Sequence, residues 1–249
     1  MATNEELRDE RNARRDHIDS LQFPLSAVAQ EERQFVETCA RMFYGEDWNY
    51  YSNALKQEVV WCFEKAIQHL GDRCSRPIRY LEIGSCQGLS MSIIGRLLFR
   101  YTGIRTLVSV DPYFPGGYSE GGRSLEGVPV AQPIDKTTRD KALALYRTLD
   151  LPVDLREKTS TSALEELIRN EARFDLVYID GSHEGMVPLV DCGLCWPLLT
   201  SDGVLMLDDH YWPDVHPVKL QCDVHCHRIA ECWKVAVYEK PRGEPRIAR

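Results

Sequence analysis

The chain has 249 residues, of which 43% are hydrophobic and 27% are charged, and its formal net charge is −8. This composition excludes a disordered or collagen-like chain, and no apolar run approaches the ~20 residues that span a bilayer. We expect no membrane partner, and the excess of acids argues against nucleic acid as a partner. The cysteines are odd in number, and the N-terminal stretch lacks the apolar core of a secretory signal. We therefore expect a cytoplasmic protein with reduced thiols.

Residues 1–75 are predicted to form an N-terminal arm followed by helices. Residues 1–30 are polar and are expected to be irregular, whereas residues 31–45 and 53–71 have helical periodicity. The i, i+4, i+7 spacing in the first helix predicts a buried face, made of Phe35, Cys39 and Met42. We expect this N-terminal segment to serve as a substrate lid or as the contact of a homo-oligomer.

From residue 76 to residue 249 we expect one α/β domain, because short apolar runs alternate with helical patterns. The predicted strands are residues 78–84, 106–113, 152–158, 173–182, 203–210 and 233–240. The predicted helices between them are residues 90–103, 136–151, 161–172 and 186–199, and a last helix is expected before the final strand. This alternation indicates a mostly parallel sheet with helices on both faces.

A long loop over residues 112–135 is rich in glycine and proline and directly follows a predicted strand. Ligands of open α/β sheets bind at the carboxyl ends of the strands, and long loops in compact domains are often functional. We expect this loop to be a substrate lid.

The first motif has the form E-x-G-x-x-x-G, with Glu82, Gly84 and Gly88, between a predicted strand and a predicted helix. Gly84 permits a tight turn, and Gly88 lets the helix start close to the strand, where a Cβ atom would crowd a cofactor. The spacing differs from that of dinucleotide-binding loops. A simple turn between strand and helix remains the alternative.

The second motif is Asp111, at the end of the next predicted strand. A carboxylate in this position of a Rossmann-like sheet can accept hydrogen bonds from both hydroxyls of a ribose. An aspartate at a strand end is also a common turn former, so that reading stays open.

Two further strands are predicted to end in acids, one with Asp180 and then His183, the other with Asp208 and Asp209. Adjacent parallel strands would bring the three carboxylates to the same edge of the sheet. Three such groups repel one another unless a cation is present, and oxygen ligands favour Mg²⁺ or Ca²⁺. The alternative is that these acids only form turns and caps.

Together, these motifs resemble the class I S-adenosylmethionine-dependent methyltransferases over residues 77–240. Within that group, residues 110–113, 178–183 and 207–211 are similar to the metal-dependent sugar O-methyltransferases of the macrocin and mycinamicin type. The resemblance implies a Rossmann-like, seven-stranded fold. It also implies O-methylation of a hydroxyl on a small-molecule natural product or sugar.

The resemblance also assigns roles to residues. Contacts to S-adenosyl-L-methionine are implied for Glu82, Gly84, Ser85, Gly88, Asp111, Ser160 and Asp180. Mg²⁺ or another divalent cation is implied at Asp180, Asp208 and Asp209, and His183 is implied as the general base. The alternatives are a metal-independent or nitrogen-directed methyltransferase, or a cofactor-binding protein without transfer activity.

A second metal site is conceivable, because Cys192 and Cys195 form a C-x-x-C pair. Further cysteines and histidines near residue 225 could complete a zinc site. However, the pair lies in an apolar helical pattern, where cysteine acts as a small buried hydrophobic residue. We therefore favour buried thiols.

Overall fold

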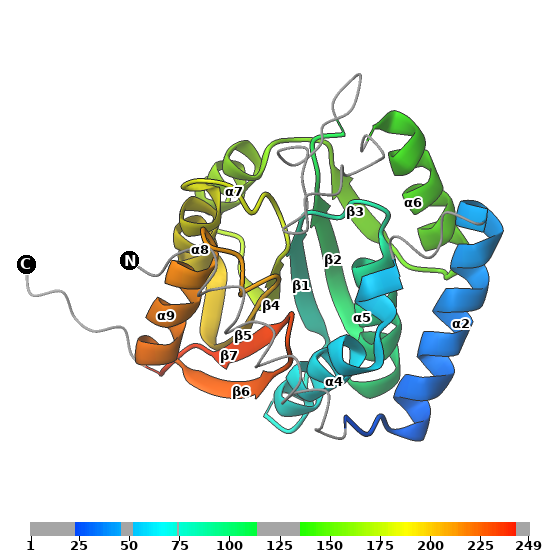
Figure 1. Ribbon diagram of the computed structural model, residues 1–249, viewed down its shortest axis with the longest axis horizontal. Helices are drawn as coiled ribbons and strands as arrows, with labels where there is room; N and C mark the ends of the chain where they lie inside the picture. The colour runs from blue at the N-terminus through cyan, green and yellow to red at the C-terminus, as the bar shows by residue number, and fades with distance from the viewer. Residues whose placement is uncertain (1–22, 46–51, 74, 114–134, 243–249) are drawn as a thin grey trace, which may run out of the picture.

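The computed structural model describes residues 23–45, 52–73, 75–113 and 135–242. A seven-stranded sheet forms the centre of the molecule, with the strand order β3-β2-β1-β4-β5-β7-β6 (Figure 1). The strands are β1 (Ile78–Ile83), β2 (Ile104–Val110), β3 (Val153–Arg156), β4 (Phe174–Ile179), β5 (Leu199–Leu207), β6 (His227–Glu231) and β7 (Ala236–Glu239). The helices are α2 (Ala27–Tyr44), the short 3₁₀ helix η2 (Ser52–Leu55), α4 (Gln57–Gly71), α5 (Leu89–Tyr101), α6 (Lys136–Thr148), α7 (Ser160–Arg169), α8 (Val187–Leu198) and α9 (His216–His225).

The sheet is mostly parallel, as the sequence predicted. Strands β3, β2, β1, β4 and β5 pair in parallel, so their carboxyl ends lie along one edge of the sheet. Strand β7 is antiparallel to both β5 and β6. Strand β6 is not among the strands predicted from the sequence, because this edge strand is short and largely exposed.

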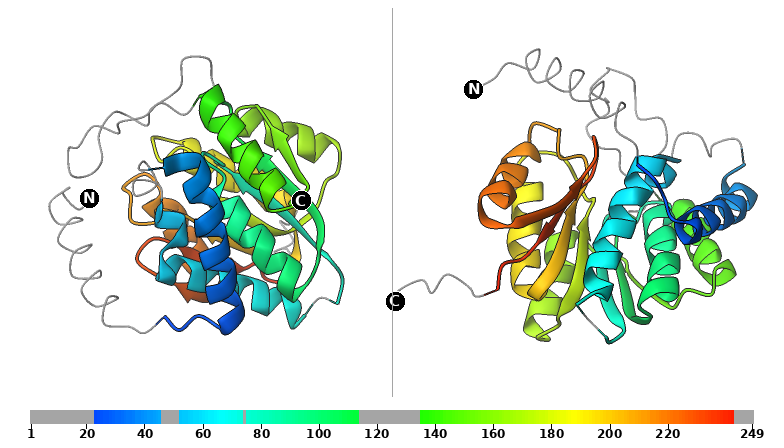
Figure 2. Two further views of the ribbon diagram at one scale, coloured as in Figure 1. Left: turned by 90° about the vertical axis from the view of Figure 1, so that its right-hand side faces the viewer. Right: turned by 90° about the horizontal axis from the view of Figure 1, so that it is seen from below.

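Two hydrophobic cores lie on opposite faces of the sheet, because side chains alternate along each strand. In β1, for example, Tyr80 belongs to one core and Leu81 to the other. Helices α2, α4, α5 and α6 cover the first face, and α7, α8 and α9 cover the second (Figures 1 and 2). This confirms the expected arrangement of helices on both faces.

The predicted buried face of the first helix is wrong for two of its three residues. Phe35 and Met42 are 43% and 65% exposed, and only Cys39 is buried. The residues buried along α2 are instead Ala29, Glu32, Val36, Cys39, Ala40 and Tyr44. A charged residue interrupts this stripe, so hydrophobicity alone does not reveal it.

The burial of Glu32 has a partner on α5. Arg96 Nε donates to Glu32 Oε2 at 2.7 Å, and Arg100 Nη1 donates to Glu32 Oε1 at 2.7 Å. The helix also begins at Ala27, within the stretch predicted to be irregular, because Ser26 Oγ caps it by accepting from the Ala29 N–H at 3.1 Å. These contacts fix α2 against α5.

The second predicted helix is confirmed as α4, with Val59, Phe63 and Leu70 buried. Helices α2 and α4 contribute to the same core as the sheet. Their expected role as a lid or an oligomer contact stays a prediction, and the long loop lies outside the described residues from 114 to 134. None of the described helices combines the length and the apolar character needed to cross a membrane.

Candidate active site

The glycine loop follows β1 at the carboxyl edge of the sheet. Gly84 has a φ of +89°, and a Cβ atom there would overlap the carbonyl oxygen of Asp180. The ends of β1 and β4 therefore touch, and only glycine fits between them. Gly88 is the N-cap residue of α5 and has a φ of +75°, and a Cβ atom there would lie 2.5 Å from the Tyr146 hydroxyl on α6. Within the described residues, the Tyr146 side chain leaves no room for a Cβ atom at Gly88, and the expected crowding of a cofactor stays a prediction.

Glu82 is completely buried beside this loop. Its carboxyl group accepts hydrogen bonds from the Tyr80 hydroxyl at 2.6 Å and from Ser90 Oγ at 2.7 Å. Burial raises the pKa of Glu82 to about 8, although these two hydrogen bonds oppose the shift. Ser85 is also buried and hydrogen-bonds through its hydroxyl to that of Ser109 on β2. Glu82 and Ser85, both predicted to bind the cofactor, thus lie at the glycine loop.

Asp111 is buried where β2 ends and is bonded to the glycine loop. Its Oδ2 accepts from the Cys86 N–H at 2.9 Å, and its Oδ1 lies 3.2 Å from the Tyr113 N–H that donates to it. The Tyr113 hydroxyl donates to the Cys86 carbonyl at 2.6 Å. The loop and the strand end are therefore held together, and the ribose contact of Asp111 stays a prediction.

Ser160 is the first residue of α7, and Thr159 caps that helix. Burial raises the pKa of Asp191 on α8 to about 6. The contact of Ser160 with the cofactor stays a prediction.

The four residues of the acidic motifs meet at one point. Asp180 follows β4, and Asp208 and Asp209 follow the adjacent strand β5. One ligand atom from each of these acids and from His183 lies within 4.8 Å of all the others. The Nε2 atom of His183 is 3.6 Å from Asp180 Oδ1 and 3.6 Å from Asp209 Oδ2. Its ring stacks on Trp212 with a centroid distance of 5.5 Å.

A lysine that was not predicted from the sequence completes this cluster. Lys234 lies in the turn between β6 and β7, and its ammonium group donates to Asp208 Oδ2 and lies 3.1 Å from Asp209 Oδ1. The other oxygen of Asp208 accepts from the Tyr178 hydroxyl at 2.6 Å. No local motif marks Lys234 in the sequence, since the antiparallel pairing of β7 with β5 brings it to the acids.

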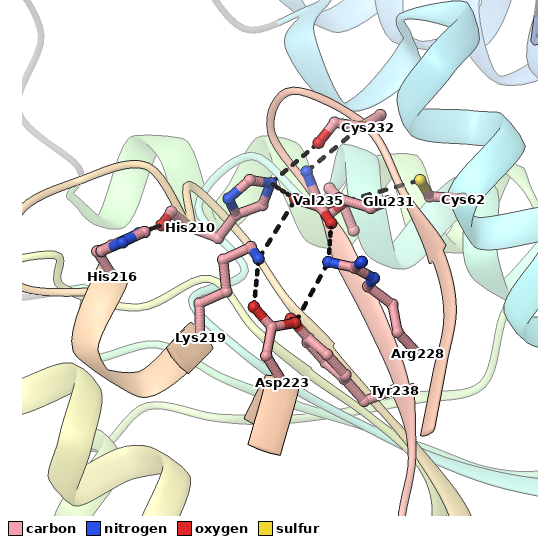
Figure 3. Close-up of polar contacts among 10 residues, drawn as sticks. All are labelled: Cys62, His210, His216, Lys219, Asp223, Arg228, Glu231, Cys232, Val235 and Tyr238. Carbon is pink, nitrogen blue, oxygen red and sulfur yellow. Dashed lines mark hydrogen bonds and ion pairs between the residues drawn. The ribbon is translucent and has the colours of Figure 1, made fainter. Parts of the chain in front are cut away.

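The turn that carries Lys234 is bonded to the loop after β5. The His210 N–H donates to the Lys234 carbonyl at 3.3 Å. The His210 Nε2 atom lies 2.9 Å from the Cys232 carbonyl, and Cys62 on α4 donates to the Val235 carbonyl at 3.7 Å (Figure 3). These contacts on both sides hold the lysine in position.

A second layer of ion pairs joins α9 to the same strands (Figure 3). The buried Lys219 donates to Asp223 at 2.6 Å and lies 3.4 Å from Glu231. Arg228 donates to Glu231 at 2.5 Å, and the Tyr238 hydroxyl donates to Asp223 at 2.8 Å. The network supports the turn without reaching the acidic cluster.

The electrostatics of the cluster differ from acid to acid. Burial and the charge of Asp180 raise the pKa of Asp208 well above its ordinary value. Burial also opposes ionisation of Asp209, but Lys234 and His183 lower its pKa below the ordinary value. Three carboxylates and an imidazole are a donor set that suits a divalent cation, so these residues fit the implied metal.

The structure does not support the alternative of a zinc site built from Cys192 and Cys195. In the part of the chain that the structure describes, the acidic cluster is the one group of histidine, cysteine and acidic residues placed to hold a metal. Cys195 is buried and Cys192 is half-buried, and no disulfide joins the eight described cysteines.

The comparisons with known proteins agree with this geometry. A family model described as a methyltransferase domain matches residues 81–210. This match includes the glycine loop, Asp111 and all four residues of the acidic cluster. No curated protein matches the chain by sequence.

Several solved structures share the fold. The SAH-bound methyltransferase PaMTH1 of Podospora anserina has a TM-score of 0.54 at 16% identity, with 98% of each chain covered. The O-methyltransferase NovP has a TM-score of 0.55 at 12% identity, covering 85% of this chain and 100% of its own. The calicheamicin methyltransferase CalS11 has a TM-score of 0.51 at 14% identity, covering 87% of this chain and 94% of its own.

These neighbours confirm the Rossmann-like fold of the class I methyltransferases. The family model covers more than half of the chain and contains the residues that meet at the carboxyl edge of the sheet. The chain belongs to the methyltransferase domain family.

Proposed function

We propose that the protein is an S-adenosylmethionine-dependent O-methyltransferase that methylates a hydroxyl group of a small-molecule natural product or sugar. Mg²⁺ or another divalent cation assists the transfer. The observation that carries this proposal is the convergence of Asp180, His183, Asp208 and Asp209 beside the glycine loop. Neighbours whose names include an O-methyltransferase and a calicheamicin methyltransferase support an oxygen acceptor on a small molecule.

The residues divide the task in a way that follows from charge. The methyl donor is a sulfonium cation, so a neutral hydroxyl must become more nucleophilic before it reacts. A divalent cation at the acidic cluster, when bound, lowers the pKa of such a hydroxyl. The glycine loop and Asp111 are expected to bind the donor, and they lie on the strands next to the cluster. The protein then needs only to align oxygen, methyl group and sulfur.

His183 has two possible uses in this reaction. An imidazole has a pKa near neutrality, so its Nε2 atom can accept the proton of the acceptor hydroxyl. The same nitrogen, 3.6 Å from two carboxylates, can instead bind a cation. Both uses are compatible with the proposed function.

A second candidate function is methyl transfer without a metal. Lys234 favours it, because its ammonium group already supplies a positive charge to Asp208 and Asp209. The two candidates differ in their response to chelation, since only the first loses activity when divalent ions are removed.

The proposal is tested with methyl-labelled S-adenosylmethionine and matched acceptors that carry either a hydroxyl or an amine, including phenols and sugars. We expect label in a product whose new methyl group is bound to oxygen, as shown by NMR. Methylation of nitrogen alone would contradict the proposal, and so would binding of the donor without transfer to any acceptor in the panel.

We also propose a cytoplasmic location, a homo-oligomeric state and no nucleic-acid partner.

A further inference from the structure

The glycine loop between β1 and α5 carries backbone strain at Cys86. This residue has a φ of +44°, in the left-handed region that residues other than glycine rarely adopt. Such a conformation persists only where the surrounding contacts hold it. One contact is made by Asp111, whose Oδ2 accepts from the Cys86 N–H at 2.9 Å. The contacts on the carbonyl side of the loop come from two buried tyrosines.

The hydroxyls of these tyrosines bind two consecutive carbonyl groups. The Tyr113 hydroxyl, beyond the end of β2, donates to the Cys86 carbonyl at 2.6 Å. The Tyr44 hydroxyl, at the last residue of α2, donates to the Gln87 carbonyl at 2.6 Å. Burial raises the pKa of Tyr44 well above its ordinary value, so its hydroxyl keeps the proton that it donates. The N-terminal segment thus reaches the glycine loop.

These hydrogen bonds also set the direction of the backbone N–H groups in the loop. A carbonyl and the N–H of the next residue lie in one planar trans peptide unit and point in opposite directions. Holding the carbonyls of Cys86 and Gln87 therefore also directs the N–H groups of Gln87 and Gly88. The Gly88 N–H donates to the Ser85 carbonyl at 2.6 Å, in the turn that precedes α5.

We propose that Tyr44, together with Tyr113, is a positioning residue that holds the glycine loop in the conformation that binds S-adenosylmethionine. This inference rests on the proposed function for the identity of the ligand. Tyr44 lies outside residues 81–210, which the family model matches. The inference therefore gives the N-terminal segment a part in cofactor binding. If a hydroxyl is removed, a smaller fraction of the protein has the competent loop, and the apparent affinity falls by the same factor.

Helix α2 is tied by a tyrosine hydroxyl at each of its ends, and this supplies a matched control. At the start of α2, the hydroxyl of Tyr101, the last residue of α5, hydrogen-bonds with Ser26 Oγ at 2.7 Å and donates to Glu64. At the other end, Tyr44 contacts the glycine loop. Tyr44→Phe and Tyr101→Phe each remove one hydroxyl that fixes α2, but only the first of these hydroxyls touches the loop.

The test measures the binding of S-adenosylhomocysteine to the full chain by isothermal titration calorimetry. The dissociation constant should rise about 10-fold in Tyr44→Phe and in Tyr113→Phe, and it should stay within about twofold of the wild type in Tyr101→Phe. Urea denaturation without ligand should show similar losses of stability in Tyr44→Phe and Tyr101→Phe, because each loses a hydrogen bond that fixes α2.

Steady-state kinetics give an independent readout. The KM for S-adenosylmethionine should rise about 10-fold in Tyr44→Phe, while kcat at saturating donor stays within about twofold of the wild type. A fall in kcat with an unchanged KM would contradict a role in positioning the cofactor loop.

An unchanged dissociation constant in Tyr44→Phe would overturn the inference, even if the variant were less stable, because the hydroxyl would then only stabilise the fold. An equal rise in Tyr101→Phe would also overturn it, since general destabilisation would explain both. If the wild-type protein bound neither S-adenosylmethionine nor S-adenosylhomocysteine, the inference and the proposed function would both fail. If it bound them with the expected tyrosine effects but methylated no acceptor, the inference would stand and the proposed function would fail.

Discussion

The two ends of strand β4 carry acids in opposite electrostatic settings. Near its beginning, Asp175 accepts paired hydrogen bonds from two guanidinium groups, those of Arg76 and Arg79, at 2.6–3.1 Å. Beyond its other end, Asp180 belongs to a cluster of three carboxylates, and one ammonium group, that of Lys234, pairs with the other two. Cations are thus in excess at one end of the strand and deficient at the other.

This difference separates an ion pair that stabilises the fold from a site that can bind a ligand. Burial opposes ionisation of Asp175, but the two arginines lower its pKa to about 2. Its charge is therefore satisfied within the protein. At the carboxyl edge of the sheet, one ammonium group faces three carboxylates, so negative charge remains that a bound cation or a proton can neutralise. The candidate site lies at the end of the strand where the protein leaves the charge unbalanced.

The largest expected effect of breaking this asymmetry is on catalysis. Asp209→Asn should lower methyl transfer by about 10²–10³-fold, the loss typical when one group that stabilises charge at a reacting centre is removed. Asp175→Asn should leave the rate within about threefold of the wild type, because Asp175 lies at the opposite end of β4. Initial rates with saturating donor measure both. Equal losses in the two variants would show that only overall stability matters.

The next effect concerns the stability of the cluster. Lys234→Met removes the ammonium group that the buried Asp208 shares with Asp209, and we expect the free energy of unfolding to fall by about 3 kcal/mol. Lys158→Met is the matched control, because the Lys158–Glu166 ion pair lies at the surface and should contribute less than about 1 kcal/mol. Urea denaturation measures both. Equal changes in the free energy of unfolding would mean that Lys234 stabilises the fold no more than a surface lysine does.

A smaller effect is expected in the pH dependence set by Asp175. Its pKa is about 2 in the folded protein and 3.8 for an ordinary aspartate, so its ion pairs stabilise the fold above pH 4. This stabilisation, about 2 kcal/mol, is lost as the pH falls from 4 to 2. The Asp175→Asn variant should lack this pH-dependent part of the free energy of unfolding. An identical acid dependence of unfolding in the two proteins would contradict the assigned ion pairs.

The main elements of this fold could be predicted from sequence because local patterns determine them. Apolar runs predicted the strands of the parallel sheet. Adjacent parallel strands bring their carboxyl ends to the same edge of the sheet, independently of the side chains. That rule alone placed Asp180, Asp208 and Asp209 at one edge. Their roles as ligands remain predictions, since geometry shows only that they meet.

The features that were missed depend on contacts between distant segments. Lys234 reaches the acids through the antiparallel pairing of β7 with β5, and no motif near it in the sequence indicates this. The buried face of α2 includes Glu32, whose burial depends on Arg96 and Arg100 of another helix. Hydrophobic periodicity cannot anticipate a charge that is neutralised from elsewhere in the chain.

The most direct test of the central claim is methyl transfer to a hydroxyl acceptor before and after removal of divalent ions. The account predicts that chelation lowers the rate by at least about 100-fold. It also predicts that Mn²⁺ or Mg²⁺ restores the rate in the wild-type protein but not in Asp209→Asn. An unchanged rate after chelation, with Asp209→Asn as active as the wild type, would contradict the claim that this cluster binds a catalytic cation.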